Sequence, residues 1–378
     1  MNFYFDNAAT TKIRPEVLNA MMPYLTEEYG NPSSLYCIGR KAKRAIEKAR
    51  EQVANLINAD KQEIYFTGCG TESDNTALKG IAYKYKEKGN HIITSKIEHN
   101  AILESCKFLE KQGFEVTYLN VNEDGRINLQ ELERTITDKT ILISIMFANN
   151  EIGTIQPIKQ IATIAHKRNI VLHTDAVQAV GNVPIDVKNM GIDMLSMSGH
   201  KIYGPKGIGA LYIKKGIEFE KFMDGGHQEK NKRAGTENLA GIVGIGKACE
   251  LAMKNLDCHI QNVKILRDYY IEKVKQNIPN IKINGSMEHR LPGNANISFE
   301  GIDSTALLLE LDKKGICVSS GSACNSGEAA PSHVLTAIGL NSDLAKSAVR
   351  VTFGEFNSKI EVDYLVQNLK EIVEKLRK

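Results

Sequence analysis

The segment Ser198-Gly-His-Lys-Ile-Tyr-Gly-Pro-Lys-Gly-Ile-Gly209 is the most informative part of the chain. It places Lys201 directly after His200, and the apolar stretch 192–197 that precedes it is typical of a buried strand. Packing alone poorly explains a lysine at the mouth of such a strand. A desolvated amine can form a Schiff base with an aldehyde, and pyridoxal phosphate is the common protein-bound aldehyde. The alternative is a surface turn with solvated lysines.

Short apolar runs alternate with amphipathic stretches around this segment. The alternation predicts an α/β fold with a mostly parallel sheet flanked by helices. The expected strands are 64–66, 91–94, 115–119, 140–147, 170–174, 192–197 and 208–213, and expected helices between them include 72–86, 101–111 and 158–167.

A long helix, continuous or broken, is expected over 238–276, and it leads to a second, smaller α+β unit. The elements expected in that unit are strands near 294–299 and 350–353 and helices at 304–314 and 359–378. The first dozen residues are apolar and could pack on either unit.

The chain has 378 residues, of which 42% are hydrophobic and 25% charged, so we expect a globular protein with one large and one smaller domain. The net charge is +3 with lysine and glutamate interspersed, which argues against nucleic-acid or anionic-membrane binding. The N-terminus lacks signal-peptide features and no apolar run is long enough to span a bilayer. A cytoplasmic location is therefore expected.

The seven cysteines are irregularly spaced and contain no Cys-x-x-Cys pair. This pattern predicts neither a disulfide framework nor a metal site. We expect most of these thiols to be inert small hydrophobic groups, with Cys324 as the exception.

Four polar clusters follow expected strands, where ligands gather in such sheets. They are Thr67–Asn75, Ala148–Gly153, Asp175–Gln178 and Ser198–Lys201. The clustering favours a functional role for Lys201 over a surface turn.

Gly68-Cys-Gly-Thr71 is a candidate phosphate cradle, because glycines let the backbone approach an anion and helix N-terminal amides donate to it. The favoured alternative, from this segment alone, is an ordinary helix start with Thr71 and Asp74 as a pair resembling a capping box.

Three side chains in the other clusters carry similar alternatives. Asp175 could hold a pyridine nitrogen protonated, or it could cap the helix that follows. Gln178 could donate to a cofactor phenolate, or it could be a surface residue. His99 could stack on a flat ring or move protons, although a lone histidine is more often structural.

The second unit contributes a thiol and a cation. Cys324 lies in a segment of small residues, Gly321–Gly327, which predicts a loop with a thiol that can reach out as a nucleophile. No basic residue adjoins it, so we expect its pKa to fall only within a positively charged active site. Arg350 lies in an apolar run and could clamp a carboxylate or form a structural ion pair.

Eight motifs, in order over nearly the whole chain, together resemble the cysteine desulfurases of the class V aminotransferase family. The branch they resemble contains the nitrogen-fixation and housekeeping iron–sulfur assembly enzymes. The motifs are Tyr4–Thr11, Gly30–Ser34, Thr71–Asn75, Asn149–Gly153, Thr174–Gln178, Ser198–Gly207, Arg233–Asn238 and Ser320–Cys324.

The resemblance implies a fold-type I homodimer that binds pyridoxal 5'-phosphate on a seven-stranded sheet. It implies a large cofactor domain over 13–255. The small domain would combine 1–12 with 256–378 and carry a mobile cysteine loop at about 320–331.

The resemblance also implies a role for each matching residue. Lys201 would carry the cofactor and then remove the Cα proton, and Cys324 would take the sulfur. The implied cofactor contacts are Asp175 with the pyridine nitrogen, Gln178 with the phenolate, His99 stacked on the ring, Gly70, Thr71, Ser198 and His200 with the phosphate, and Thr236 from the partner subunit. Asn31, Asn150 and Arg350 would bind the substrate carboxylate.

The implied reaction converts L-cysteine to L-alanine and leaves a persulfide on Cys324. The sulfur would pass to an iron–sulfur scaffold protein or a tRNA thiolation enzyme. The alternatives are a selenocysteine lyase, another enzyme acting on a β-substituted amino acid, and a non-catalytic assembly scaffold. Departures from the family pattern at Tyr36, Cys37, Cys69 and Glu355 leave substrate preference and partner choice open.

Overall fold

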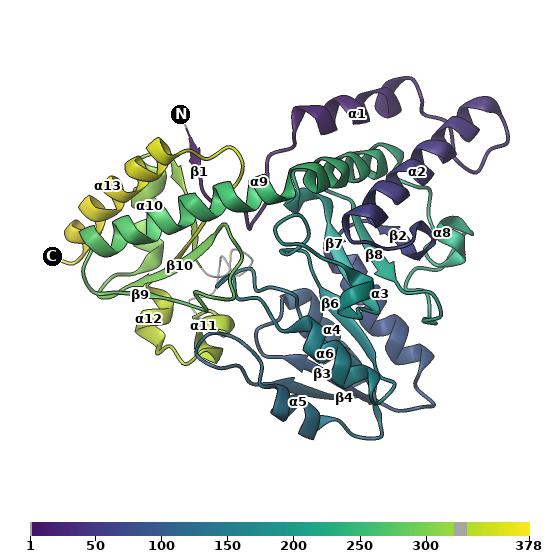
Figure 1. Cartoon of the computed structure of the whole chain (residues 1–378), viewed down its shortest axis with the longest axis horizontal. Helices are drawn as coiled ribbons and strands as arrows, with labels where there is room; N and C mark the ends of the chain where they lie inside the picture. The colour runs from purple at the N-terminus through teal and green to yellow at the C-terminus, as the bar shows by residue number, and fades with distance from the viewer. Residues whose placement is uncertain (1, 321–330) are drawn as a thin grey trace.

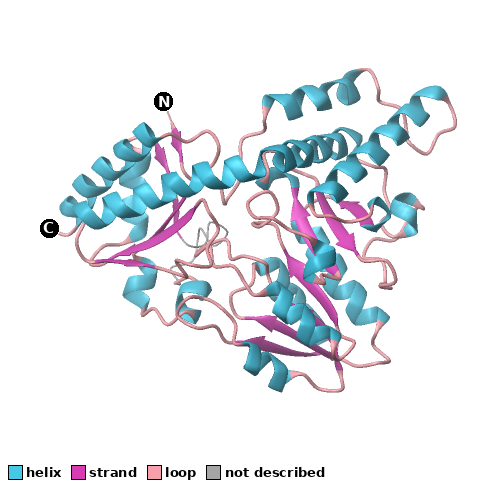
Figure 2. Cartoon of the chain, viewed as in Figure 1, coloured by secondary structure: helices cyan, strands magenta, loops and turns pink. Residues whose placement is uncertain are grey.

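The computed structural model describes residues 2–320 and 331–378, and its central feature is a seven-stranded sheet flanked by helices (Figures 1 and 2). The strand order is β2-β8-β7-β6-β5-β3-β4. These strands are β2 (Ile64–Thr67), β3 (His91–Ser95), β4 (Glu115–Leu119), β5 (Thr140–Ser144), β6 (Val171–Asp175), β7 (Met194–Ser198) and β8 (Gly209–Ile213).

The sheet is mostly parallel, as the alternating pattern predicted. β4, β3, β5, β6 and β7 pair in parallel, whereas β8 runs antiparallel to both β7 and β2. β2 therefore points the same way as the parallel strands, and its carboxyl end reaches the same edge of the sheet. This direction places the segment after β2 beside those that follow β6 and β7.

Both faces of the sheet are buried, which explains why its strands are continuously apolar rather than alternating. Ile93 and Ile143 pack in one hydrophobic core, and their neighbours Ile92 and Leu142 pack in the core on the opposite face. The helices and short turns of this part of the chain are α1 (Pro15–Thr26), α2 (Cys37–Leu56), η1 (Lys61–Glu63), α3 (Gly70–Lys84), α4 (Asn100–Lys111), α5 (Leu129–Thr135), α6 (Ile158–His166), α7 (Val187–Met190), η2 (Gly199–Lys201) and α8 (Gln228–Asn231).

β5 ends three residues before the strand expected over 140–147. The reason lies in the next turn of chain, where the backbone N–H of Met146 donates to the carboxyl group of Glu98 at 3.0 Å. The Glu98 side chain thus accepts from a backbone N–H that would otherwise donate to a carbonyl group of a neighbouring strand.

The C-terminal part forms a second layer around an antiparallel sheet with the order β12-β13-β10-β9. Its strands are β9 (Ile281–Ile283), β10 (Asn294–Phe299), β12 (Ser319–Ser320) and β13 (Ala348–Thr352). A separate pair joins β1 (Phe3–Tyr4) to β11 (Ile316–Cys317) in parallel. The helices here are α10 (Ser304–Asp312), α11 (His333–Ala337), α12 (Ser342–Lys346) and α13 (Lys359–Leu376).

Helix α9 (Leu239–Asn277) joins the two parts as one continuous helix of 39 residues (Figure 1). Its buried residues up to Cys249 belong to the core of the large sheet, and those from Val263 belong to the core of the C-terminal sheet. The expected division between residues 255 and 256 falls within this helix and stays a prediction.

The N-terminal strip lies between the two parts, which its composition alone left undecided. β1 pairs with β11, and Asp6 forms a bridge with Thr352 of β13. Further along, the backbone N–H of Thr11 donates to the carbonyl of His200 at 2.9 Å. The strip therefore connects the C-terminal sheet to the turn that carries Lys201.

Two expectations about the chain as a whole can be compared with the described residues. Within 2–320 and 331–378, no helix is both long and apolar enough to cross a membrane.

Cys106 and Cys249 are buried, and burial raises the pKa of the Cys249 thiol to about 12. Cys37, Cys69 and Cys258 are exposed, so these three thiols are not buried hydrophobic groups, and their inertness stays a prediction.

Candidate active site

A cavity of about 310 Å³ opens at the carboxyl edge of the large sheet. That volume lies within the usual range for small-molecule sites. Ten of the residues expected in the site line it: Gly70, Thr71, His99, Asn150, Asp175, Gln178, Ser198, His200, Lys201 and Arg350.

Three expected site residues are not part of this cavity as described. Cys324 lies outside the described residues. Asn31 does not line the cavity, and its side-chain oxygen accepts from the backbone N–H of Ser33 at 2.9 Å. Thr236 lines a separate, smaller pocket with Arg233. One chain therefore does not bring Asn31 and Thr236 to Lys201.

Lys201 ends the short turn η2, directly after β7. Its Nζ donates to the carbonyl oxygens of Ala8 and, at 2.7 Å, Ala9. The N-terminal strip thus supplies polar partners that point the amine into the cavity. Gln178 shares this arrangement, because its Nε2 donates to the Ala8 carbonyl at 3.0 Å. The interpretation of Gln178 as a surface residue is therefore wrong.

Asp175 is the last residue of β6 and is buried. Its Oδ1 accepts from the backbone N–H of Val177 at 2.9 Å, so the carboxyl group caps the following turn and lines the cavity at once. Burial raises the pKa of Asp175, and burial together with the nearby Asp175 carboxyl raises that of Asp74 well above its usual range. Two acids whose charges interact in this way favour a positively charged ligand atom at this end of the cavity.

The start of α3 differs from the helix start expected at Thr71. The helix begins at Gly70, with Cys69 as the N-cap residue and no side-chain cap, so the pairing of Thr71 with Asp74 as a capping box is wrong. A Cβ at Gly70 would lie 2.7 Å from Cγ2 of Val177. Only glycine fits this close approach, which leaves the first amides of α3 facing the cavity.

Ser198 lies beside this helix start, because its Cβ would be 3.6 Å from a Cβ at Gly70, and His200 lines the same cavity. Burial, followed by the charges of Lys201 and Lys206, lowers the pKa of His200 to about 4. The imidazole is therefore neutral at pH 7, and its Nδ1 lies 3.1 Å from the Thr10 hydroxyl. Neutral donors next to a lysine and a helix N-terminus suit a phosphate group.

His99 is the N-cap residue of α4, as its place after a strand predicted. Its Nδ1 accepts from the backbone N–H of Ala101 at 3.1 Å. Because Nδ1 accepts, the hydrogen of the neutral ring is on Nε2. The backbone contact fixes the ring plane at the wall of the cavity, as stacking on a planar ligand requires.

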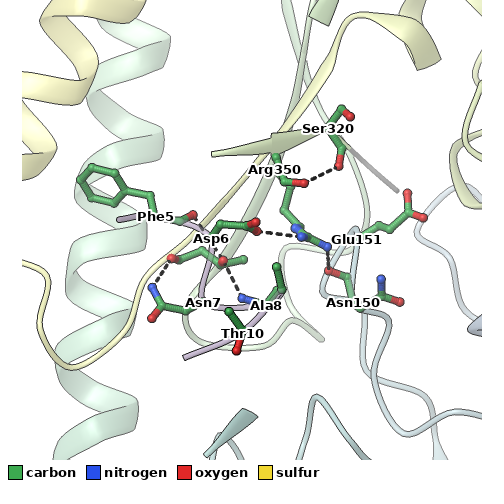
Figure 3. A network of polar contacts seen from close by, with 12 residues as sticks. Phe5, Asp6, Asn7, Ala8, Thr10, Asn150, Glu151, Ser320 and Arg350 are labelled. Atoms are coloured by element: carbon green, nitrogen blue, oxygen red, sulfur yellow. Dashed lines mark hydrogen bonds and ion pairs between the residues drawn. The ribbon is translucent and has the colours of Figure 1, made fainter. Parts of the chain in front are cut away.

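Arg350 lies on β13, where it forms the ion pair that was one of its two expected roles, and its role as a carboxylate clamp stays a prediction. Its Nη2 forms an ion pair with Asp6 at 2.7 Å, and its Nη1 donates to the Asn150 carbonyl at 3.1 Å (Figure 3). It also lines the cavity. The structural ion pair therefore coexists with a guanidinium available to the site.

Two buried acids that line the cavity, Glu98 and Glu151, were not among the site residues expected from the sequence. Glu98 accepts from the Ser95 hydroxyl at 2.6 Å, and Glu151 accepts from the Ser332 hydroxyl at 2.6 Å. His333 also lines the cavity, and its Nε2 lies 3.0 Å from the Glu98 carbonyl. In the sequence, Glu98 adjoins His99 and Glu151 adjoins Asn150, which were both expected in the site. Burial of these two acids, however, depends on tertiary contacts.

Replacing Glu98 with glutamine should remove a pH-dependent loss of stability. Burial raises the pKa of Glu98 to about 8. Between the ordinary pKa of a glutamate and pH 8, the folded protein keeps the Glu98 proton and the unfolded protein releases it. The free energy of unfolding therefore falls as the pH rises toward 8, by up to about a few kcal/mol. The melting temperatures of Glu98→Gln and wild type should be similar at pH 5, with the variant higher at pH 8. The same difference in melting temperature between the variant and wild type at both pH values would contradict this prediction.

Comparison with known proteins shows the family of the chain. Residues 3–365 match the model of the family "Aminotransferase class-V". This chain belongs to that family. It is 53% identical to "Cysteine desulfurase IscS" of Clostridium botulinum (strain Hall), covering 99% of this chain and 95% of that protein. It is 54% identical to the protein of the same name from Methanosarcina thermophila, covering 99% and 92%.

Solved structures give the same result at the level of the fold. A "NIFS-LIKE PROTEIN" superposes with a TM-score of 0.94 at 38% identity and covers 100% of both chains. "SspA in complex with cysteine" has a TM-score of 0.83 at 38% identity, covering 95% of this chain and 100% of that one. The family and fold expected from the motifs are confirmed.

Proposed function

We propose that this protein is a pyridoxal-phosphate-dependent cysteine desulfurase that converts L-cysteine to L-alanine. The observation that carries the proposal is that Lys201, which follows β7, Asp175 at the end of β6 and Arg350 in the middle of β13 line one cavity of about 310 Å³. An amine, a buried acid and a guanidinium are the groups needed for an aldehyde cofactor, its ring nitrogen and an amino-acid carboxylate.

The chemistry of the donor set fits the cofactor. The helix start at Gly70, with Thr71, Ser198 and His200, would hold its phosphate, and Asp175 would accept from its ring nitrogen. His99 would stack on the ring and Gln178 would donate to its phenolate oxygen. When bound, the cofactor withdraws electrons from the substrate Cα and so weakens the bonds around it.

The remaining steps belong to the residues of this chain. Arg350 and the side chain of Asn150 would bind the substrate carboxylate, and the Lys201 amine would take the Cα proton. The Cys324 thiolate would form an S–S bond with the substrate sulfur as the C–S bond breaks. The electron pair of that bond stays on Cβ, which takes a proton. The Lys201 ammonium would return a proton to Cα to give alanine, and Cys324 would keep a persulfide.

We propose further that the site is completed by a second copy of the chain. Leu18, Met22 and Leu25 form an exposed apolar stripe along α1, and Leu35 in the following segment is 88% exposed. Exposed apolar groups at this density mark an interaction surface. A second copy covering them would also let Thr236 of the partner subunit reach the cavity, as the family resemblance implies.

The double variant Leu25→Asp/Leu35→Asp should shift the protein from dimer to monomer, because each aspartate would have to lose its hydration at the interface. Sedimentation velocity measures the shift. The matched control is Ile360→Asp, which changes an 82% exposed residue on α13. A wild-type monomer, or a double variant that remains dimeric, would contradict the proposed interface.

The proposed activity is tested by product analysis. Holoprotein incubated with L-cysteine and a reductant should yield alanine and sulfide in equal amounts. Without reductant, mass spectrometry should find one extra sulfur atom on the peptide that contains Cys324. Turnover of L-selenocysteine but not L-cysteine would overturn the proposed substrate, and a holoprotein with no turnover of either would indicate a scaffold.

The sulfur acceptor follows from the same proposal. We propose that the persulfide is passed to an iron–sulfur scaffold protein or a tRNA thiolation enzyme. Transfer of ³⁵S from labelled L-cysteine through Cys324 to each acceptor would separate the two. Retention of the label on this chain in the presence of both would contradict the proposed acceptors.

A further inference from the structure

Arg350 is held by two groups of the chain before any ligand arrives. Its side chain is only 2% exposed, with Asp6 on Nη2 at 2.7 Å and the Asn150 carbonyl on Nη1 at 3.1 Å (Figure 3). Among the described residues, its buried Nε has no hydrogen-bond partner. An arginine has five N–H donors, so the guanidinium retains donors for a further acceptor.

Asp6 is fixed in place rather than free at the surface. The backbone N–H of Ala9 and the Tyr4 hydroxyl both donate to the Asp6 carbonyl, at 2.9 and 3.0 Å. The Tyr4 hydroxyl also lies 2.9 Å from the Thr10 carbonyl and thus closes a compact turn over residues 6–10. Asp6 bridges to Thr352 on β13, the strand that carries Arg350. Its carboxylate is therefore a permanent neighbour of the guanidinium.

The other acid near Arg350 is Glu151. Burial raises the pKa of Glu151, and its Oε2 accepts from the Ser332 hydroxyl at 2.6 Å. Asp6 is the acid in direct contact with the guanidinium. A ligand carboxylate bound by Arg350 must then lie within a few ångströms of the Asp6 carboxylate. Like charges at such a separation repel, and in a buried site water screens them weakly.

We propose that Asp6 is a positioning residue that keeps Arg350 oriented and lowers its affinity for carboxylates. The inference rests on the proposed role of Arg350 in binding the substrate carboxylate. The resident charge repels every carboxylate at this guanidinium to the same extent. A simple anion has only the guanidinium to bind and so binds weakly, whereas an amino acid gains affinity from its other contacts in the cavity.

The test measures binding of propionate, a carboxylate without an amino group, to the holoprotein. The readouts are the dependence of the melting temperature on propionate concentration and the inhibition constant against L-cysteine. Asp6→Asn retains an acceptor for Nη2 and removes the charge, so we expect propionate to bind roughly five- to tenfold more tightly. Asp6→Glu retains the charge and should bind propionate about as weakly as wild type.

Two further variants make the outcome specific. Tyr4→Phe removes the hydroxyl that closes the turn but leaves the ion pair, so propionate affinity should not change. If Asp6→Asn does not fold, Asp6→Ser is measured with the same expectation of tighter binding. Unchanged or weaker binding in the neutral variants, or an equal gain in Tyr4→Phe, would overturn the inference.

Failure of the underlying function is seen separately with Arg350→Gln. Propionate binding that is insensitive to this change would mean that Arg350 does not bind carboxylates, which overturns the proposed substrate site. Binding that depends on Arg350 but is not strengthened in the neutral Asp6 variants overturns only the role of Asp6.

Discussion

Lys201→Ala should lower alanine formation from L-cysteine by at least roughly 10²–10⁴-fold, the usual contribution of a positioned acid–base group. Lys201 is the lysine that lines the cavity at the end of β7, where Ala8 and Ala9 hold its amine. Loss of the amine also removes the covalent attachment of the cofactor. The near-visible absorption of the purified protein should therefore change with the substitution, and both quantities are measured on one preparation.

The matched control is Lys206→Ala. Lys206 lies in the same glycine-rich segment but is exposed and does not line the cavity. It should retain wild-type absorption and nearly wild-type turnover. A Lys201→Ala variant that keeps both the absorption band and its activity would overturn the assignment of Lys201, and with it the proposed function.

Cys324→Ser should abolish sulfide release under reductant, with a decrease of at least about 10²-fold. A serine hydroxyl is far less nucleophilic than a thiolate and cannot hold the sulfur as a persulfide. The variant should still bind the cofactor and keep its absorption, because both depend on Lys201, which is unchanged. L-cysteine should still perturb that absorption, which separates loss of sulfur transfer from loss of binding.

Cys69→Ser is the control for this change, because Cys69 is an exposed thiol that lines the cavity. If Cys69 rather than Cys324 accepted the sulfur, Cys69→Ser would abolish sulfide release and Cys324→Ser would retain it. Full sulfide release by Cys324→Ser would refute its role as the nucleophile. The prediction depends on the motif Ser320–Cys324, since Cys324 lies outside the described residues.

One departure from the family pattern has a structural explanation. Glu355 forms an ion pair with Arg14. The backbone N–H of Glu355 also donates to the hydroxyl of Tyr203, two residues after Lys201. The glutamate is thus matched by a cation from the N-terminal strip. Motif comparison could flag the residue, but its partner is 341 positions away and is visible only in the structure.

Local pattern predicted the elements of the large sheet because their cause is local. The expected strand 115–119 matches β4 in full, and each of the four polar clusters that follow expected strands contributes residues to the cavity. The errors occurred where a distant group intervenes. Glu98 shortens β5 by taking the Met146 N–H, and the close approach of Val177 requires glycine at the start of α3.

The amino-acid sequence alone determined the α/β fold, the family and the identity of the lysine and acid at the strand ends, because periodicity and motif spacing are properties of neighbouring residues. Tertiary structure decided where the N-terminal strip lies, that its carbonyls hold Lys201, and that Asp6 is the partner of Arg350. It also decided which acids are buried. Contacts between residues 192 to 344 positions apart, and the desolvation that accompanies them, leave no periodic trace along the chain.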